Sequence, residues 1–341
     1  MNNNLESQWQ SPSNIALVKY WGKKDNQIPA NTSVSFTLNH CNTTTSLTAV
    51  SPSDSPFIYV ELNNKATPAF APKIEHFFNQ VAAQLPFIRD YHWEVKTHNT
   101  FPHSSGIASS ASGMSALALC LLSIAEKLGI RTDNFLQTAS TLARIGSGSA
   151  CRSIYGPCTV WGQHSDYLNS SDLYAVEVDH IHPVFETFCD TILIVHAGQK
   201  SISSSVGHNM VNTNPFASAR FNWANKQAGL LLPILKNGDI AAFVDIVETE
   251  ALMLHALMMS STPGFMLMKP NTLAIIEKIR EYRKQNNNSF VFTLDAGANV
   301  HFMYSKQDEK DALAFIQSDL VGLCDEGRYI CDAVGNGPKQ L

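Results

Sequence analysis

The feature that most restricts the fold of this chain is a loop of small residues that runs straight into an apolar helix pattern. The loop reads FPHSSGIASSASG, residues 101–113. Beyond it, apolar residues recur at spacings of three and four, which predicts a helix with one apolar face that must be buried. These residues are Met114, Leu117, Ala118, Leu121, Ala125 and Leu128, and Gly129 supplies the stop signal.

This loop has two interpretations. The first turn of a helix presents free N–H groups and the positive end of the helix dipole, which suits phosphate. Pro102 stiffens the entry, Gly106 permits close approach of a ligand, and the Ser109 and Ser110 hydroxyls can contact phosphate or a metal ion. The loop lacks the ending of a Walker A motif and the glycine spacing of a dinucleotide fingerprint. The alternative is an ordinary helix entry with a serine as its N-cap.

Two more segments are candidates for binding an anion. The stretch SPSNIALVKYWGKKD concentrates Lys19, Lys23 and Lys24 near the end of an apolar strand pattern. The loop ARIGSGSACRSIYG places Arg152 after small donor residues, and a guanidinium can donate two parallel hydrogen bonds to carboxylate or phosphate. Each has a simpler alternative, a solvated strand end for the first and a flexible turn for the second.

A third loop, GQKSISSSVGHN, follows a short apolar run and carries Lys200 and the serines at 203–205. Loops at strand ends often carry ligands, but the composition of this loop by itself favours an exposed linker.

A carboxylate and the histidines complete the list of candidate chemical groups. Asp295 lies in TLDAGANV, at a predicted strand end among small residues, where it either closes an Asx-turn or faces a substrate as a proton acceptor. The histidines at 92, 98, 103, 180 and 182 lack a helical ligand spacing, so no protein metal site is predicted.

Composition limits the class of protein. Of the 341 residues, 44% are hydrophobic and 16% charged, which is typical of a globular protein. The net charge of −5 provides no basic field for nucleic acid. No apolar run approaches a membrane span, the N-terminus does not resemble a signal peptide, and the seven cysteines show no paired spacing. We therefore expect a soluble cytoplasmic protein with reduced thiols and with neither a membrane nor a nucleic-acid partner.

The coarse pattern predicts an α+β architecture. Strands are expected at NIALVKYW, SVSFTL, TTTSLTAV, FIYVELN and WEVKTHN, with a turn at 39–42 between the second and third. After the first helix, further helices are expected near 134–145, 217–236 and 238–259, and at TLAIIEKIREYRKQ. The apolar run TILIVHAG predicts a buried strand, and SFVFTLDAGANVHFMY predicts two strands joined by a tight turn.

Taken together, five segments resemble the diphosphomevalonate decarboxylase family of the GHMP kinase superfamily. They are NIALVKYWGK, IPANTSVSFTL, FPHSSGIASSASG, GSGSACRSIYG and TLDAGAN, and they span residues 14–299 in the family's order. The resemblance implies a two-domain α+β GHMP kinase fold, with residues 1–188 as the nucleotide-binding domain, residues 189–341 as the second α+β domain, and the active site between them.

The resemblance also implies a reaction and its participants. MgATP would phosphorylate the C3 hydroxyl of mevalonate 5-diphosphate, and loss of phosphate and CO2 would give isopentenyl diphosphate and ADP. The cofactors would be ATP and Mg2+, with the ion arriving on ATP and Ser110 as its possible protein ligand. Family members are frequently homodimers, so a homodimer is expected.

The roles carried over by resemblance fall into three sets. The catalytic set is Asp295 at the C3 hydroxyl as base or orienting group, Lys19 beside the reacting centre, and Arg152 on the substrate carboxylate. The remaining substrate-binding set, largely for the diphosphate, is Asn14, Tyr20, Lys23, Ser147, Ser149 and Ser204. The ATP and Mg2+ set is Pro102, Ser104, Ser105, Gly106, Ser109 and Ser110.

Departures from the family pattern leave alternatives. Ile145 stands where a basic residue often precedes GSGSACRS, and Gly207-His208 stands where Gly-Met is common. Relatives that decarboxylate mevalonate 5-phosphate, or that phosphorylate C3 without decarboxylation, are the nearest alternatives. A non-catalytic nucleotide-binding protein on the same fold is the alternative from another class.

Overall fold

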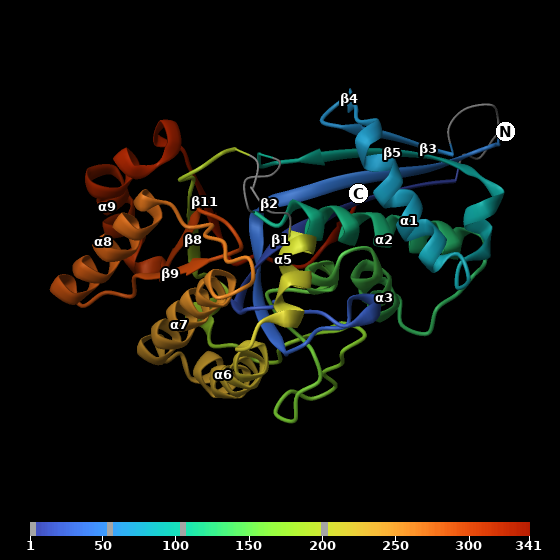
Figure 1. Ribbon diagram of the computed structural model, residues 1–341. Coiled ribbons are helices and arrows are strands. Elements are labelled where there is room, and N and C mark those ends of the chain that lie inside the picture. Colours follow the sequence, from blue (N-terminus) through green and yellow to red (C-terminus); the bar gives the residue numbers. More distant parts are fainter. Residues whose placement is uncertain (1–4, 53–56, 103–106, 199–203) are drawn as a thin grey trace.

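The chain folds around two β-sheets, and in the view of Figure 1 the smaller sheet lies to the left of the larger one. The computed structural model describes residues 5–52, 57–102, 107–198 and 204–341. The larger sheet contains β1 (Leu5–Val18), β2 (Ser33–Val50), β3 (Ile58–Leu62), β4 (Lys65–Ala66), β5 (His92–Asn99), β6 (Cys158–Trp161), β7 (Ala175–Glu177) and β12 (Lys339–Gln340). The smaller sheet has the order β11-β8-β10-β9, from β8 (Cys189–Leu193), β9 (Val291–Leu294), β10 (Val300–Tyr304) and β11 (Tyr329–Ala333).

The helices lie against these sheets. Those in the first half are α1 (Ala71–Val81), α2 (Ser109–Lys127), α3 (Phe135–Gly146) and α4 (Pro183–Glu186). Those in the second half are α5 (Ser204–Met210), α6 (Ala217–Asn237), α7 (Ile240–Met259), α8 (Pro270–Asn286) and α9 (Glu309–Phe315). The predicted α+β class and the predicted helices of this set are therefore confirmed.

Helix α2 is the central helix of the N-terminal half. It packs on β1, β2 and α3, and Gly129 follows its end with φ of +83°, a left-handed conformation that suits glycine. By length and composition α2 is able to cross a membrane, but 78% of its most apolar window is buried inside the protein. The expectation that no apolar run approaches a membrane span was wrong, because a core helix enclosed on all sides is apolar all round.

The start of α2 differs from the interpretation of the loop as a helix entry with a serine N-cap. Ala108 occupies the N-cap in a left-handed conformation, with φ of +43°, and supplies no side-chain cap. The helix therefore does not begin with a serine N-cap.

The smaller sheet carries the hairpin β9–β10, whose connecting turn contains Asp295 as the sequence predicted. The backbone N–H of Gly297 donates to the Asp295 carbonyl at 2.7 Å and so tightens this turn. Helices α7 and α8 pack against β9. The run TILIVHAG contributes β8, which pairs with both β10 and β11 and is buried along its length.

The predicted turn at 39–42 is not formed, and this is a correction to the sequence analysis. β2 runs from Ser33 to Val50, and between the pairs Pro12↔Asn42 and Asn14↔Thr37 it contains a wide bulge. Before the bulge β2 pairs with β6, and after it β2 pairs with β5. The chain thus changes partner strands without reversing direction, which a local turn signal cannot distinguish from a turn.

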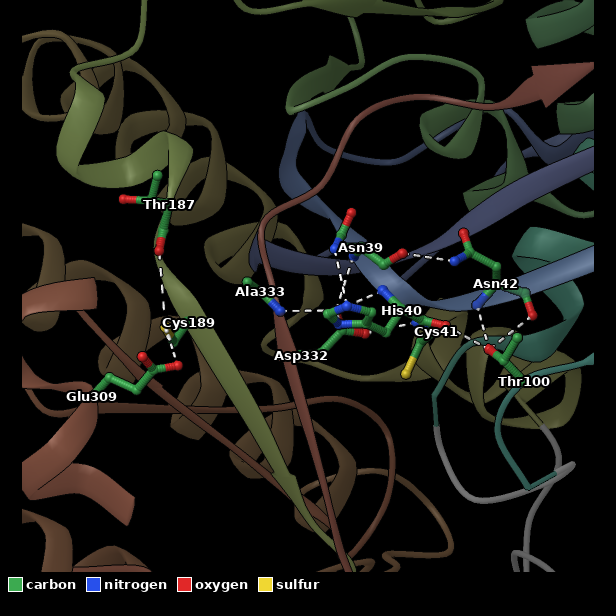
Figure 2. A network of polar contacts seen from close by, with 10 residues as sticks. All are labelled: Asn39, His40, Cys41, Asn42, Thr100, Thr187, Cys189, Glu309, Asp332 and Ala333. Atoms are coloured by element: carbon green, nitrogen blue, oxygen red, sulfur yellow. Dashed lines mark hydrogen bonds and ion pairs between the residues drawn. The ribbon is translucent and has the colours of Figure 1, made fainter. Parts of the chain in front are cut away.

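The side chain of Asp332 holds the bulge in place. Its carboxylate accepts hydrogen bonds from the backbone N–H groups of Asn39 at 2.9 Å, His40 at 2.8 Å and Cys41 at 2.7 Å (Figure 2). Because Asp332 lies on β11 and its side chain is fully buried, this anion links the smaller sheet to the larger one. Backbone donors that the bulge removes from the β-ladder are thereby satisfied.

Replacing Asp332 with Asn should destabilise the protein by about 2–4 kcal/mol, because three charge-assisted hydrogen bonds lose their anion and an amide N–H2 group faces other donors. Urea denaturation followed by circular dichroism measures this change. Asp311→Asn, at an exposed carboxylate of α9, is the matched control and should change stability by less than about 0.5 kcal/mol. Equal stability of the two variants would show that the bulge does not depend on this carboxylate.

Candidate active site

A cavity of about 780 Å³ collects side chains from both sheets. It contains ten of the residues singled out in the sequence: Asn14, Lys19, Tyr20, Lys23, Ser109, Ser110, Ser147, Ser149, Arg152 and Asp295. They come from the end of β1, the start of α2, the segment after α3 and the turn after β9. Segments almost 300 residues apart in the chain thus meet in one site.

Five of the candidates are not placed in this cavity. Pro102 is described but is not part of the wall, whereas Ser104, Ser105 and Gly106 lie outside the described residues. Ser204 begins α5, but its side chain lies outside the described part of the structure, as do Lys200 and Ser203. Lys24 is exposed beside the cavity, so only two lysines of the opening cluster line it.

Lys19 is buried at the point where β1 ends, with 1% of its surface exposed. Its backbone N–H donates to the Glu250 carboxylate of α7 at 3.0 Å, and its carbonyl accepts from the Asn31 amide at 3.0 Å. The ammonium itself donates to the Ala16 carbonyl. Burial lowers the pKa of Lys19 to about 8, while the Asp295 and Glu250 carboxylates oppose that shift. The lysine is therefore held in place by the fold and is ready to lose its proton just above neutral pH.

Glu250 is fixed in turn by Arg220. The Arg220 guanidinium contacts the same carboxylate oxygen at 2.7 Å, and both side chains are buried. Such a buried pair costs desolvation, so its presence behind Lys19 indicates a need for negative charge there.

Arg152 is anchored by two polar side chains. Its Nε and Nη2 donate to the Asn14 amide oxygen at 3.3 and 3.2 Å, and its Nη1 donates to the Ser33 hydroxyl at 3.0 Å. The ring centroids of Tyr20 and Trp161 lie 5.9 and 5.8 Å from the guanidinium carbon. This arrangement fixes the plane of the guanidinium and leaves one N–H on each terminal nitrogen without a partner among the described residues.

Tyr20 forms a corner of the cavity with Gly148. A Cβ atom at position 148 would lie 2.6 Å from the Tyr20 hydroxyl and 3.0 Å from the Trp161 ring. Only glycine fits there, which gives a packing reason for the second glycine of the GSGS loop. The loop continues as a short 3-10 helix, Gly148–Ile154, that carries Ser149 and Arg152 to the cavity wall.

The opposite end of the cavity suits a flat, partly apolar group. Its wall combines aliphatic and aromatic side chains of β3, β5, α2, α1 and the turn before α1 with polar and charged ones of β2, β5 and α1: Thr43, Thr45, Val60, Leu62, Phe70, Lys73, Ile74, His76, Phe77, Gln80, Val95, Thr97, Asn99, Met114 and Leu117. The first turn of α2, with Ser109, Ser110 and Gly113, lies at the cavity wall as well. Free N–H groups at a helix start fit a phosphate chain bound between this wall and Lys19.

Three residues in or behind the cavity wall carried no signal in the sequence. Glu250 and Arg220 lie inside amphipathic helices, where a charged residue usually faces solvent. His208, in the wall beside Tyr20, was noted only as a departure from a family pattern. Only the packing of α5, α6 and α7 against the end of β1 places these side chains.

Comparison with known proteins covers nearly the whole chain. Residues 11–175 match a family model described as the diphosphomevalonate decarboxylase-like N-terminal domain, and residues 191–339 match the mevalonate 5-diphosphate decarboxylase C-terminal domain. The diphosphomevalonate decarboxylase of Debaryomyces hansenii is 29% identical over 325 residues, which cover 90% of this chain and 81% of that protein.

Solved structures agree over the full length. The mevalonate diphosphate decarboxylase of Staphylococcus aureus superposes with a TM-score of 0.86 at 26% identity, covering 98% of each chain. A structure described as MDDEF in complex with MVAPP, AMPPCP and magnesium superposes with a TM-score of 0.85 at 26% identity, covering 99% of each chain. This agreement confirms the expected GHMP kinase fold.

The pKa of Lys19 predicts a pH effect. The ammonium is present below about pH 8 and lost above it, so kcat/KM should fall as pH rises through that value, since kcat/KM reports the free enzyme. Glu250→Gln removes a charge that raises the pKa of Lys19, so the fall should begin at lower pH. Steady-state kinetics between pH 6 and 9.5 measure it.

Glu248→Gln is the matched control for this experiment. Glu248 is a second buried carboxylate of α7, paired with Arg280 and Arg283 rather than placed behind Lys19. Its replacement should lower stability without moving the pH profile. An identical profile for wild type and Glu250→Gln would show that Glu250 does not act on Lys19.

Proposed function

This chain belongs to the diphosphomevalonate decarboxylase family, and from that premise we propose that it converts mevalonate 5-diphosphate to isopentenyl diphosphate. ATP is consumed, and ADP, phosphate and CO2 are released. The observation that carries this proposal is the cavity in which Lys19, Arg152 and Asp295 come together. Two fixed cations and a carboxylate next to a helix N-terminus match a substrate with an anion at each end and a phosphoryl acceptor between them.

Arg152 binds the substrate carboxylate in this proposal. One N–H on each of its terminal nitrogens is left for a ligand, and two parallel donors match the two oxygens of a carboxylate. Asn14 then acts mainly through Arg152, because its amide oxygen already accepts from that guanidinium.

The diphosphate lies at the Tyr20 corner. Lys23, Ser147 and Ser149 supply a cation and hydroxyl or backbone donors there, and all three line the cavity. Ile145 also lines the cavity and adds no charge. In the proposal Lys23 therefore supplies the cation that binds the diphosphate. Ser204 is kept as a proposed contact through its place at the start of α5.

Asp295 accepts the proton of the C3 hydroxyl, or aligns that hydroxyl, as phosphate is transferred to its oxygen. The Lys19 ammonium next to it favours the ionised carboxylate and offsets phosphate charge. In the second stage the C3–O bond breaks and positive charge develops at C3. The bond to CO2 then supplies the electrons of the new double bond. Lys19 and Arg152 stay on anionic groups, so neither cation faces C3.

ATP and Mg2+ bind at the start of α2, with Ser109 and Ser110 at the phosphates, in this proposal. The related structure MDDEF holds AMPPCP and magnesium, which supports the assignment for this chain. Bound there, MgATP supplies the phosphoryl group. Ser104, Ser105, Gly106 and Pro102 complete the proposed loop around it.

We also propose a domain division near residues 188 and 189, a homodimer, and a cytoplasmic location. All seven cysteines are unpaired, which fits a reducing compartment. Phe216 at the N-cap of α6, and Trp223 and Leu230 on this helix, lie seven residues apart with exposed side chains, so they share one face and suit a subunit contact. Sedimentation equilibrium of the purified protein tests the dimer.

The first test of the reaction is a product balance. With MgATP and mevalonate 5-diphosphate, we expect equal amounts of ADP and CO2, and little product from mevalonate or its 5-phosphate. CO2 formed mainly from the 5-phosphate would reassign the substrate. ADP without CO2 would make the protein a kinase. The absence of both products would contradict catalysis on this pathway.

Asp295→Asn should lower kcat by about 10³-fold, because the C3 hydroxyl loses its proton acceptor, while mevalonate 5-diphosphate still binds. Rapid-quench kinetics for the first step and isothermal titration for binding measure these effects. Asp311→Asn is again the exposed control. Wild-type kcat in Asp295→Asn would assign the proton transfer to another group.

A further inference from the structure

His208 is a wall residue of the cavity that the proposed reaction has not used. It lies on α5 with 8% of its surface exposed, packed between two aromatic rings. Its ring centroid is 4.4 Å from that of Trp21, nearly parallel, and 4.5 Å from that of Tyr20. The two rings of the KYWGK segment therefore fix the imidazole in one orientation.

A backbone hydrogen bond determines which nitrogen carries the proton. The N–H of Gly22 donates to Nδ1 of His208 at 3.0 Å, so Nδ1 is the acceptor and the proton of the neutral ring resides on Nε2. Gly22 has a φ of +106°, and a side chain there would clash with Phe221. The Gly22 N–H is therefore held in position, like the imidazole ring to which it donates.

The surroundings keep this imidazole neutral. Burial and, after it, the Lys23 and Arg152 cations lower the pKa of His208 to about 3, against the opposing effect of the Asp295 carboxylate. Among the nearby charges Lys23 has the largest effect, ahead of Asp295 and Arg152. The hydrogen bond from Gly22 and the ring contacts with Tyr20 and Trp21 place His208 against the segment that ends in Lys23.

The Nε2–H group is left for a ligand. Within the described part of the chain Nε2 has no hydrogen-bond partner. It is also not one of the fully buried polar atoms without a partner, so this nitrogen is accessible from the cavity. A rigid donor beside Tyr20 and Lys23, on the wall of the cavity, faces the space assigned to the diphosphate.

We propose that His208 is a further substrate-binding residue, which donates its Nε2–H to a phosphate oxygen of the substrate. This assignment rests on the proposed function and deepens it. A neutral donor strengthens binding of the diphosphate without adding a charge next to Lys23 and Arg152. Trp21 and Tyr20 thus hold in place a donor that a short helix from the other half of the chain supplies.

Two substitutions separate the roles of the two ring nitrogens. In His208→Asn the amide oxygen takes the place of Nδ1 and still accepts from Gly22, but nothing reaches the cavity. In His208→Gln the amide nitrogen takes the place of Nε2 and keeps the donor. We expect KM for mevalonate 5-diphosphate to rise about tenfold in His208→Asn and less than about threefold in His208→Gln. In both variants kcat should stay within about twofold and KM for ATP should be unchanged.

Several results would overturn the assignment. Unchanged KM in His208→Asn, equal losses in the two variants, or a parallel rise of KM for ATP would each show a role in packing alone. If wild type fails to turn over mevalonate 5-diphosphate, the proposed function itself is wrong, which is a distinct result.

A measurement on the wild-type protein avoids the risk that a variant fails to fold. In ¹⁵N-histidine NMR of the labelled protein, adding mevalonate 5-diphosphate should shift the Nε2 resonance of His208 downfield while Nδ1 remains an unprotonated acceptor. An unchanged Nε2 resonance at saturation, or a protonated Nδ1, would contradict a neutral donor to phosphate.

Discussion

The burial of the Lys19 ammonium at the end of β1 is the constraint on which the site depends. A cation removed from water needs fixed partners, and here they come from three places: the Ala16 carbonyl, the Glu250 carboxylate behind the backbone and the Asp295 carboxylate across the cavity. Glu250 belongs to α7 and Asp295 to the turn after β9, so the second half of the chain must dock on the first before Lys19 is stable in its position. The same docking closes the cavity.

The junction that permits this docking is the bulge of β2. There the strand leaves β6 and joins β5, and the backbone donors released by the change are taken by Asp332 of β11 (Figure 2). This buried carboxylate joins the smaller sheet to the larger one together with the Leu38↔Val334 bridge and the hydrogen bonds between Thr37 and Gly335. β11 pairs with β8, and β8 pairs with β10, the strand that follows the turn carrying Asp295.

Close packing contacts fix the polar side chains at the substrate end of the cavity. Gly148 leaves room for the Tyr20 hydroxyl, Trp161 and Tyr20 flank the Arg152 guanidinium, and Trp21 stacks on His208. Each aromatic ring both packs in the core and orients one polar group. In the proposed function this corner recognises the diphosphate by geometry as much as by charge. Ile145, which also lines the cavity, provides no cation there.

The sequence by itself determined the elements and the chemistry. Periodicity placed α2, α3, α6, α7 and the hairpin β9–β10, and five motifs identified the family, because these depend on short-range pattern and on residues that the chemistry requires. The tertiary structure alone decided the bulge at 39–42, the absence of a serine N-cap at Ala108, the place of Glu250 and Arg220 behind Lys19, and the place of His208 in the cavity wall. Each of those depends on a partner distant in the chain: Asp332 for the bulge, Lys19 for Glu250, and Gly22 for His208. Local patterns hold no information about such partners, since burial and docking decide which polar groups must be paired.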